Sequence, residues 1–135
     1  MRAYIDADIL IWHLRGKKVA GNFLKSLQDK KKYELWIGAM QRAEVVFFMR
    51  PNEEKDTLTF LSLFQTAPID QHVVDIAGQI FRNWNPSHGV DIHDAILAAT
   101  AMNSGGKIYT LNMKHYPMSN IVVEKAWDKR GRIYL

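Results

Sequence analysis

Short runs of β-forming residues alternate along this chain with longer stretches that favour helices. The runs lie at residues 3–5, 33–37, 67–69, 107–111 and 121–123. Neighbouring parallel strands need long crossover connections, which helices usually supply. The alternation therefore predicts an α/β fold with a mostly parallel central sheet.

The segments between these runs have the composition or the apolar spacing of helices. The predicted helices cover residues 8–12, 19–29, 39–50, 52–64, 73–84 and 91–103. Pro51 is expected to end one helix, residues 85–89 to form a loop, and Gly105 with Gly106 to end the last helix. Ligands of such folds bind beyond the carboxyl ends of the strands, so the residues after each run are the first site candidates.

Composition excludes several kinds of site. The 135 residues suit one domain, expected to span 1–135, and they contain no repeat, linker or low-complexity segment. The absence of cysteine excludes a disulfide framework, a thiolate zinc site and a cysteine nucleophile. None of the 5 histidines has HExxH spacing. Any metal ion must therefore be held by oxygen or imidazole.

Hydropathy and charge bear on location and partners. No apolar run approaches the ~20 residues of a membrane span, and the first residues do not resemble a secretory signal. We therefore expect a cytoplasmic protein with no membrane partner. The 18 Lys and Arg exceed the 14 Asp and Glu by a net charge of +4. This bias permits a polyanionic partner without identifying it.

Acidic residues stand where a site is expected. Asp6 follows the first strand directly, although either Asp6 or Asp8 could simply cap the helix that follows. Glu44 has Met40, Phe47 and Phe48 among its helical neighbours, which places its carboxylate on or beside a buried face. Glutamate is seldom buried without a partner, so we favour a functional role over a salt bridge.

The last predicted helix begins with two further acids. Asp91 has the position of a helix cap, and both Asp91 and Asp94 match the helix dipole. Asp94 has apolar neighbours at helical spacing, so we assign it mainly to the site and Asp91 mainly to capping. Thr110 lies in the fourth predicted strand and Asn112 comes just after it, so both place polar groups at another carboxyl end.

Three converging carboxylates would repel one another and raise their own pKa values unless a cation neutralised them. Oxygen ligands without thiolates suit Mg²⁺ or Mn²⁺, which also accept phosphate oxygens from a substrate. The reaction that follows is metal-assisted hydrolysis of a phosphodiester. Asp6, Glu44 and Asp94 are the expected metal-binding acids.

The same residues carry a family resemblance. Four segments in order along the chain resemble the PIN domain, particularly the VapC-type toxin ribonucleases. They are Tyr4 to Ile11, Ala43 to Val45, Asp94 to Ala101 and Thr110 to Tyr116.

The resemblance implies a three-layer α/β/α fold and a Mg²⁺- or Mn²⁺-dependent endoribonuclease. It also implies a homodimer and an antitoxin protein encoded beside it. Asp6, Glu44 and Asp94 match the metal-binding acids of the family, and Thr110 and Asn112 match its polar motif. Many members have another aspartate near that motif, where this chain has Asn112 and His115. Asp91 is an additional candidate ligand.

An acidic pocket cannot attract RNA unaided, so basic groups are expected around it. The candidates follow Asp6 or Asn112 in the chain: Arg15, Lys17, Lys18, Lys114 and His115.

Two alternatives to the nuclease remain open at this point. One is a PIN-like scaffold that binds RNA or protein without cleaving it. The other is a receiver-like module that takes up phosphate, for which Asp70 after Ile69 is the only candidate acceptor.

Overall fold

The computed structural model describes residues 1–135 and contains one five-stranded sheet in which every strand pair is parallel. The spatial order is β3-β2-β1-β4-β5. The strands are β1 (Arg2–Ile5), β2 (Glu34–Gly38), β3 (Gln65–Ala67), β4 (Lys107–Thr110) and β5 (Val122–Lys125). The predicted α/β fold is confirmed, and the sheet is wholly parallel.

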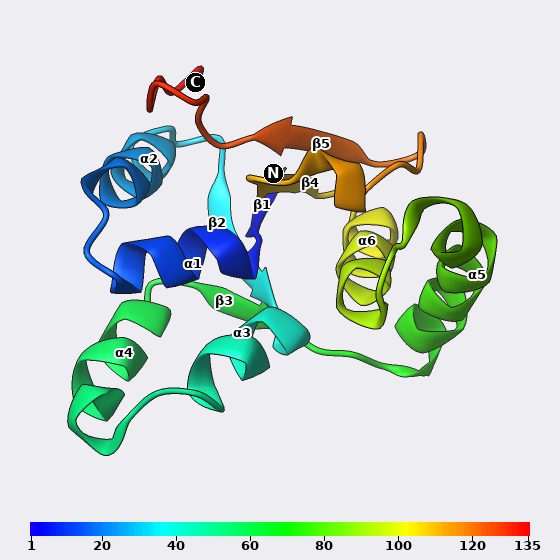
Figure 1. Ribbon diagram of the computed structural model, residues 1–135, viewed down its shortest axis with the longest axis horizontal. Coiled ribbons are helices and arrows are strands. Elements are labelled where there is room, and N and C mark those ends of the chain that lie inside the picture. The colour runs from blue at the N-terminus through cyan, green and yellow to red at the C-terminus, as the bar shows by residue number, and fades with distance from the viewer.

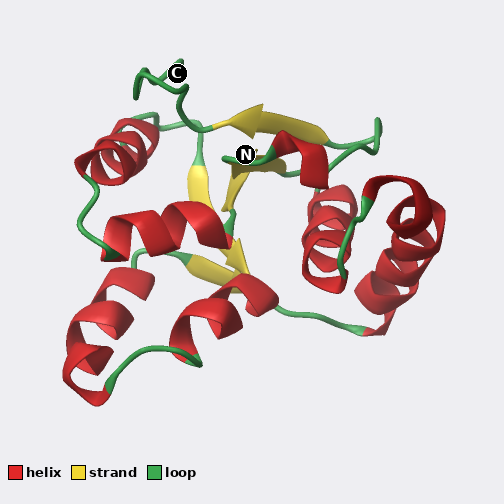
Figure 2. Ribbon diagram, in the orientation of Figure 1, coloured by secondary structure: helices red, strands yellow, loops and turns green.

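Six α-helices and two short 3₁₀ turns connect the strands (Figures 1 and 2). The helices are α1 (Ala7–Leu14), α2 (Lys18–Gln28), α3 (Ala39–Val46), α4 (Glu54–Leu61), α5 (Gln71–His88) and α6 (Ile92–Ser104). The 3₁₀ turns are η1 (Pro51–Glu53) and η2 (Met113–His115). None of these helices combines the length and the apolar character that crossing a membrane requires.

The alternation of side chains along the strands builds two cores, one on each face of the sheet. On β1, Ala3 and Ile5 pack with α1, α2 and α4, whereas Tyr4 packs on the opposite face with α5 and α6. On β4, Ile108 and Tyr109 divide between the two faces in the same way. The fold therefore has three layers, with the sheet between two groups of helices.

Two adjacent glycines allow α6 to turn directly into β4. Gly105 caps the helix in the left-handed conformation, at a φ of 75°, which side-chain-bearing residues seldom adopt. A Cβ on Gly106 would lie 2.4 Å from the ring of Tyr4. The predicted helix end is confirmed, and close packing against β1 explains the second glycine.

The predicted loop at residues 85–89 is wrong, because α5 continues to His88 with Pro86 inside its last turn. Proline removes a single backbone donor there, and the surrounding contacts retain the helix. Gly89 forms the left-handed cap, its N–H donates to Asn85 O at 3.0 Å, and Trp84 packs edge-on against His88.

One strand and two helices also differ markedly from their predicted bounds. The third strand covers Gln65–Ala67 rather than 67–69, because Pro68 has no N–H for a ladder. The helix predicted at 39–50 ends at Val46, and the one predicted at 52–64 covers only Glu54–Leu61 after the 3₁₀ turn. Pro51 begins that turn, where its fixed φ is favourable.

Candidate active site

Asp6 and Thr110 meet at the carboxyl ends of adjacent strands. Because Ile5 pairs with Tyr109 in the parallel ladder, the residues that follow lie side by side. The Thr110 hydroxyl donates to Asp6 Oδ2 at 2.9 Å, while Asp6 Oδ1 accepts from the N–H of Ala7 at 2.8 Å and caps α1. Asp6 is 7% exposed, so both carboxylate oxygens are held in fixed positions.

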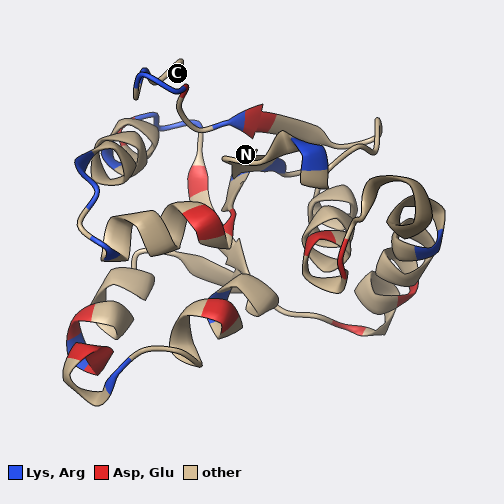
Figure 3. Ribbon diagram, viewed as in Figure 1, with Lys and Arg blue, Asp and Glu red and all other residues tan.

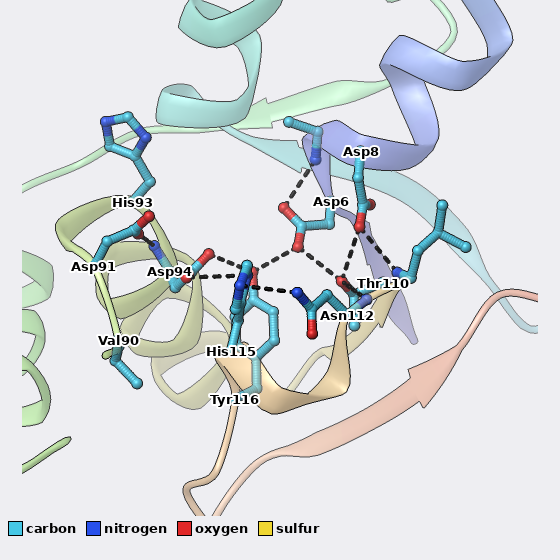
Figure 4. Close-up of polar contacts among 12 residues, drawn as sticks. Asp6, Asp8, Val90, Asp91, His93, Asp94, Thr110, Asn112, His115 and Tyr116 are labelled. Carbon is cyan, nitrogen blue, oxygen red and sulfur yellow. Dashed lines mark hydrogen bonds and ion pairs between the residues drawn. The ribbon is translucent and has the colours of Figure 1, made fainter. Parts of the chain in front are cut away.

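The Tyr116 hydroxyl joins Asp6 to Asp94 (Figure 4). It lies 2.8 Å from Asp6 Oδ2 and 3.4 Å from Asp94 Oδ1. Burial and the two neighbouring carboxylates raise the pKa of Tyr116 well above its usual range. The hydroxyl therefore keeps its proton and serves as a donor between two acids from different layers of the fold.

Asp94 enters the site from the first turn of α6. Asp91 caps this helix and accepts from the N–H of Asp94 at 2.8 Å, which confirms the predicted cap. Burial, Asp91 and Asp6 raise the pKa of Asp94 to about 8. At neutral pH the carboxylate form of Asp94 is therefore disfavoured unless a cation is present.

His115 and Asn112 form the rim beside Asp94. His115 Nδ1 lies 3.4 Å from Asp94 Oδ2, and its Nε2 lies 2.9 Å from Asn112 Nδ2. If the amide donates to Nε2, the ring proton is on Nδ1 and faces the carboxylate. Asn112 thus acts on the acids through His115.

Asp8 belongs to the same cluster, although the sequence suggested only a helix cap for it. Asp8 Oδ2 accepts from the N–H of Leu111 at 3.0 Å and from the Thr110 hydroxyl at 3.3 Å. Burial and the charge of Asp6 raise the pKa of Asp8 to about 6. The Thr110 hydroxyl is consequently within hydrogen-bond distance of both Asp6 and Asp8.

Glu44 lies beside these acids but has its own partner. Its Oε1 lies 2.5 Å from His93 Nδ1, a contact that is an ion pair when the ring is protonated. Burial raises the pKa of Glu44 despite His93, and Asp6 and Asp91 contribute to the rise. The partner is therefore neither Arg42 nor a lysine, which were the salt-bridge alternatives.

A cleft opens next to Glu44 between α1, α3 and α4. Its volume is about 520 Å³, and Ile11, Val45 and Phe48 line it together with Arg15 and Glu44. Among the predicted basic residues, Arg15 is thus beside the acids. Lys17 lies over the ring of Trp12 at 5.6 Å, whereas Lys18 and Lys114 are exposed without such a contact.

The chemistry of the donor set fits a divalent cation. None of Asp6, Asp8, Glu44 and Asp94 forms an ion pair with Lys or Arg, and burial with mutual repulsion raises three of their pKa values. The side chains as they stand do not bring three His, Asp or Glu ligands together around one metal position. Binding would therefore require these side chains to rearrange, because the hydroxyl of Tyr116 stands between Asp6 and Asp94.

Three contributors were not found from the sequence. Asp8 was concealed by its position at a helix start, where a cap is the common role. Tyr116 and His93 act through a hydroxyl and a ring nitrogen whose positions depend on tertiary packing. The only available signal was their place within or beside the segments that carry the family resemblance.

The sequence matches the PIN domain family over residues 3–116. Ribonuclease VapC10 of Mycobacterium tuberculosis is 33% identical over 115 residues, which cover 84% of this chain and 85% of that protein. Ribonuclease VapC19 of the same organism is 30% identical over 115 residues, covering 84% of this chain and 91% of that protein.

Solved structures share the fold. VapBC2 from Rickettsia felis, bound to a promoter DNA fragment, has a TM-score of 0.76 at 20% identity and covers 95% of this chain and 100% of that chain. A toxin-antitoxin complex from Klebsiella pneumoniae has a TM-score of 0.73 at 22% identity, covering 93% and 98%. From the matched family segment and these relatives, the chain belongs to the PIN domain family.

Proposed function

We propose that this protein is a metal-dependent endoribonuclease that hydrolyses RNA phosphodiester bonds and acts as the toxin of a toxin-antitoxin pair. The observation that carries the proposal is the cluster of the buried Asp6 and Asp94 with the partly buried Asp8 at the carboxyl edge of the sheet, with no Lys or Arg paired to it. Two relatives that are 30% or more identical are named ribonucleases, which supports the same reaction.

Asp6 and Asp94 are the proposed principal ligands of Mg²⁺ or Mn²⁺, with Glu44, and in addition Asp91, as the remaining acids of the ligand set. Such an ion, when bound, lowers the pKa of a water molecule and offsets charge on the phosphate. The protein groups supply the rest. Thr110 orients Asp6 and Asp8, and Asn112 orients His115 beside Asp94.

A protein partner is proposed for the cleft beside Glu44. Phe47 and Phe48 are 79% and 82% exposed at the end of α3, which is unusual for large apolar side chains in an unpartnered protein. The structure from Klebsiella pneumoniae is described as a toxin-antitoxin complex. We propose that an antitoxin covers this cleft and excludes substrate from the acids.

A homodimer is the proposed assembly. Val74 and Ile92 are exposed on α5 and α6, and they line an apolar groove of about 260 Å³ with Ala77, Phe81 and Ile96. Burial of this groove against a second copy would remove apolar area from water. Light scattering of the purified chain would test it, with Ile92→Lys expected to shift the mass to that of a monomer.

Cleavage of a labelled single-stranded RNA tests the reaction. The protein is stripped with EDTA and assayed with and without added Mg²⁺ or Mn²⁺. Activity should require the ion and should be lost in Asp6→Asn, whereas the exposed control Asp75→Asn should retain it. Equal residual cleavage in Asp6→Asn and the wild type would show a contaminating nuclease and overturn the proposal.

A non-catalytic scaffold is the second candidate, and one observation favours it. The acids do not come together around a single metal position, and Asn112 and His115 stand where many family members have a further aspartate. RNA binding without any cleavage at saturating Mn²⁺ would support this role. The receiver-like alternative loses its basis, because Asp70 caps α5 and follows the edge strand β3.

A further inference from the structure

A stripe of α1 leads away from the acidic cluster. The partly buried Asp8 and the exposed Trp12 stand four residues apart on one side of the helix, and the exposed Arg15 is the C-cap at its end. Asp8 contacts Thr110 and Leu111 within the cluster. Trp12 is 39% exposed one turn further on, with Lys17 over its ring. The stripe therefore continues the site with an aromatic surface and cations.

The segment after β5 is attached beside this stripe. Lys125 is in register with Thr110, and the N–H of Ala126 donates to Thr110 O at 3.0 Å. Trp127 is buried edge-on against Trp12, with ring centroids 6.4 Å apart. The chain beyond β5 thus begins with a hydrogen bond to a site residue and contacts α1 at Trp12.

An ordered turn follows and presents further cations. Asp128 accepts from the N–H groups of Arg130 and Arg132, each at 2.9 Å, and its own N–H donates to Arg132 O at 3.0 Å. A Cβ on Gly131 would lie 3.5 Å from Val19, which shows that this turn packs on α2. Figure 3 shows Lys and Arg on this C-terminal segment and near the ends of α2.

The basic side chains along this path are not held in close ion pairs, and the nearest carboxylate with an electrostatic effect is Asp128 beside Arg132. None of them forms an ion pair within the chain. They are Arg15, Lys17, Lys18, Lys125, Lys129, Arg130 and Arg132. Together with Trp12 they are named the cationic track. Lys125, Lys129, Arg130 and Arg132 lie beyond residue 116, where the family match ends.

We propose that the cationic track binds single-stranded RNA and guides it to the acidic cluster, an inference that rests on the proposed function for its choice of ligand. A polyanion that approaches four carboxylates is repelled unless cations beside them attract its phosphates. An exposed tryptophan stacks on bases without sequence preference. The track offers both kinds of contact, and its members Lys125 and Trp12 lie next to Thr110 and Asp8.

Fluorescence anisotropy of a labelled single-stranded RNA of ~12 nucleotides tests the track. Binding is measured in EDTA, so cleavage does not contribute. Arg130→Ala/Arg132→Ala should bind roughly tenfold more weakly at ~0.1 M salt, with the slope of log K against log salt reduced by about 1.4. Both substitutions leave the backbone contacts of Asp128 available.

The matched control is Lys31→Ala/Arg82→Ala, which removes the same charge at exposed positions in the α2–β2 connection and on α5. It should retain wild-type affinity. Trp12→Ala should weaken binding roughly fivefold or more, and Trp12→Phe should restore most of it because a stacking surface remains. Thermal unfolding of each variant separates lost binding from lost folding.

Three results would overturn the track. If Arg130→Ala/Arg132→Ala and the control Lys31→Ala/Arg82→Ala weaken RNA binding equally, the net charge of the protein accounts for the binding and the track does not. A polyglutamate peptide that binds as tightly as RNA, with the same dependence on Trp12, would assign the track to an acidic protein partner. If RNA binding depends on the track but the protein cleaves no RNA, only the proposed reaction is overturned. If the protein cleaves RNA and the substitutions in the track do not change RNA binding, only the track is overturned.

Discussion

Tyr116 separates Asp6 from Asp94, because its hydroxyl lies 2.8 Å from the first carboxylate and 3.4 Å from the second. Replacing Tyr116 with Phe should lower the free energy of unfolding of the metal-free protein by ~1–3 kcal/mol, since two buried acids lose their shared donor. Denaturant unfolding in EDTA measures the loss. The control is Tyr134→Phe, whose exposed hydroxyl contacts only Asp128. A loss as large in the control would contradict the role given to Tyr116.

Asp94 should make the metal-free protein less stable as pH rises. Its pKa in the folded state is about 8, above the ordinary value of 3.8, so the folded state binds more protons than the unfolded state between these values. The free energy of unfolding therefore falls with rising pH across that range. Asp94→Asn should flatten the fall and increase stability at about pH 8. Chemical denaturation from about pH 5 to pH 9 measures the free energy of unfolding, with Asp75→Asn as control. If Asp94→Asn shows the same dependence on pH as the wild type, Asp94 is not the group responsible.

Mg²⁺ or Mn²⁺ should raise the Tm at neutral pH, because an ion bound only by the folded state stabilises it by mass action. Asp94→Asn should lose most of that gain. Asp91→Asn should keep most of it, since Asn caps a helix about as well as Asp and Asp91 is assigned mainly to the cap. Differential scanning calorimetry with and without the ion compares them. A full metal response in Asp94→Asn would place the ion elsewhere.

Thr110 should act by positioning Asp6 and Asp8. Thr110→Val keeps the volume of the side chain and removes the hydroxyl that both acids accept from. Cleavage should fall by ~10–100-fold, the usual cost of losing a group that orients metal ligands. Thr110→Ser retains the hydroxyl and should recover most of the rate. Equal rates for the valine and serine variants would show that the hydroxyl does not contribute.

Much of the fold could be predicted because its signals are local. The order of strands and helices followed from apolar runs and periodicity, and Asp6 and Thr110 were assigned to strand ends that the parallel ladder brings together. The boundaries failed where local signals compete. Pro86 suggested a loop, yet the contacts of the last turn retain it in α5.

By itself, the sequence determined that Asp6 and Asp94 come to the carboxyl edge, because strand ends and helix starts are encoded by neighbouring residues. Only the tertiary structure decided what each acid contacts. Tyr116 reaches Asp6 across 110 positions of sequence, and His93 rather than Arg42 pairs with Glu44. Such contacts depend on how η2 and α6 pack against the sheet. No local sequence pattern specifies the position of a hydroxyl group accurately enough to predict which side chain it will hydrogen-bond.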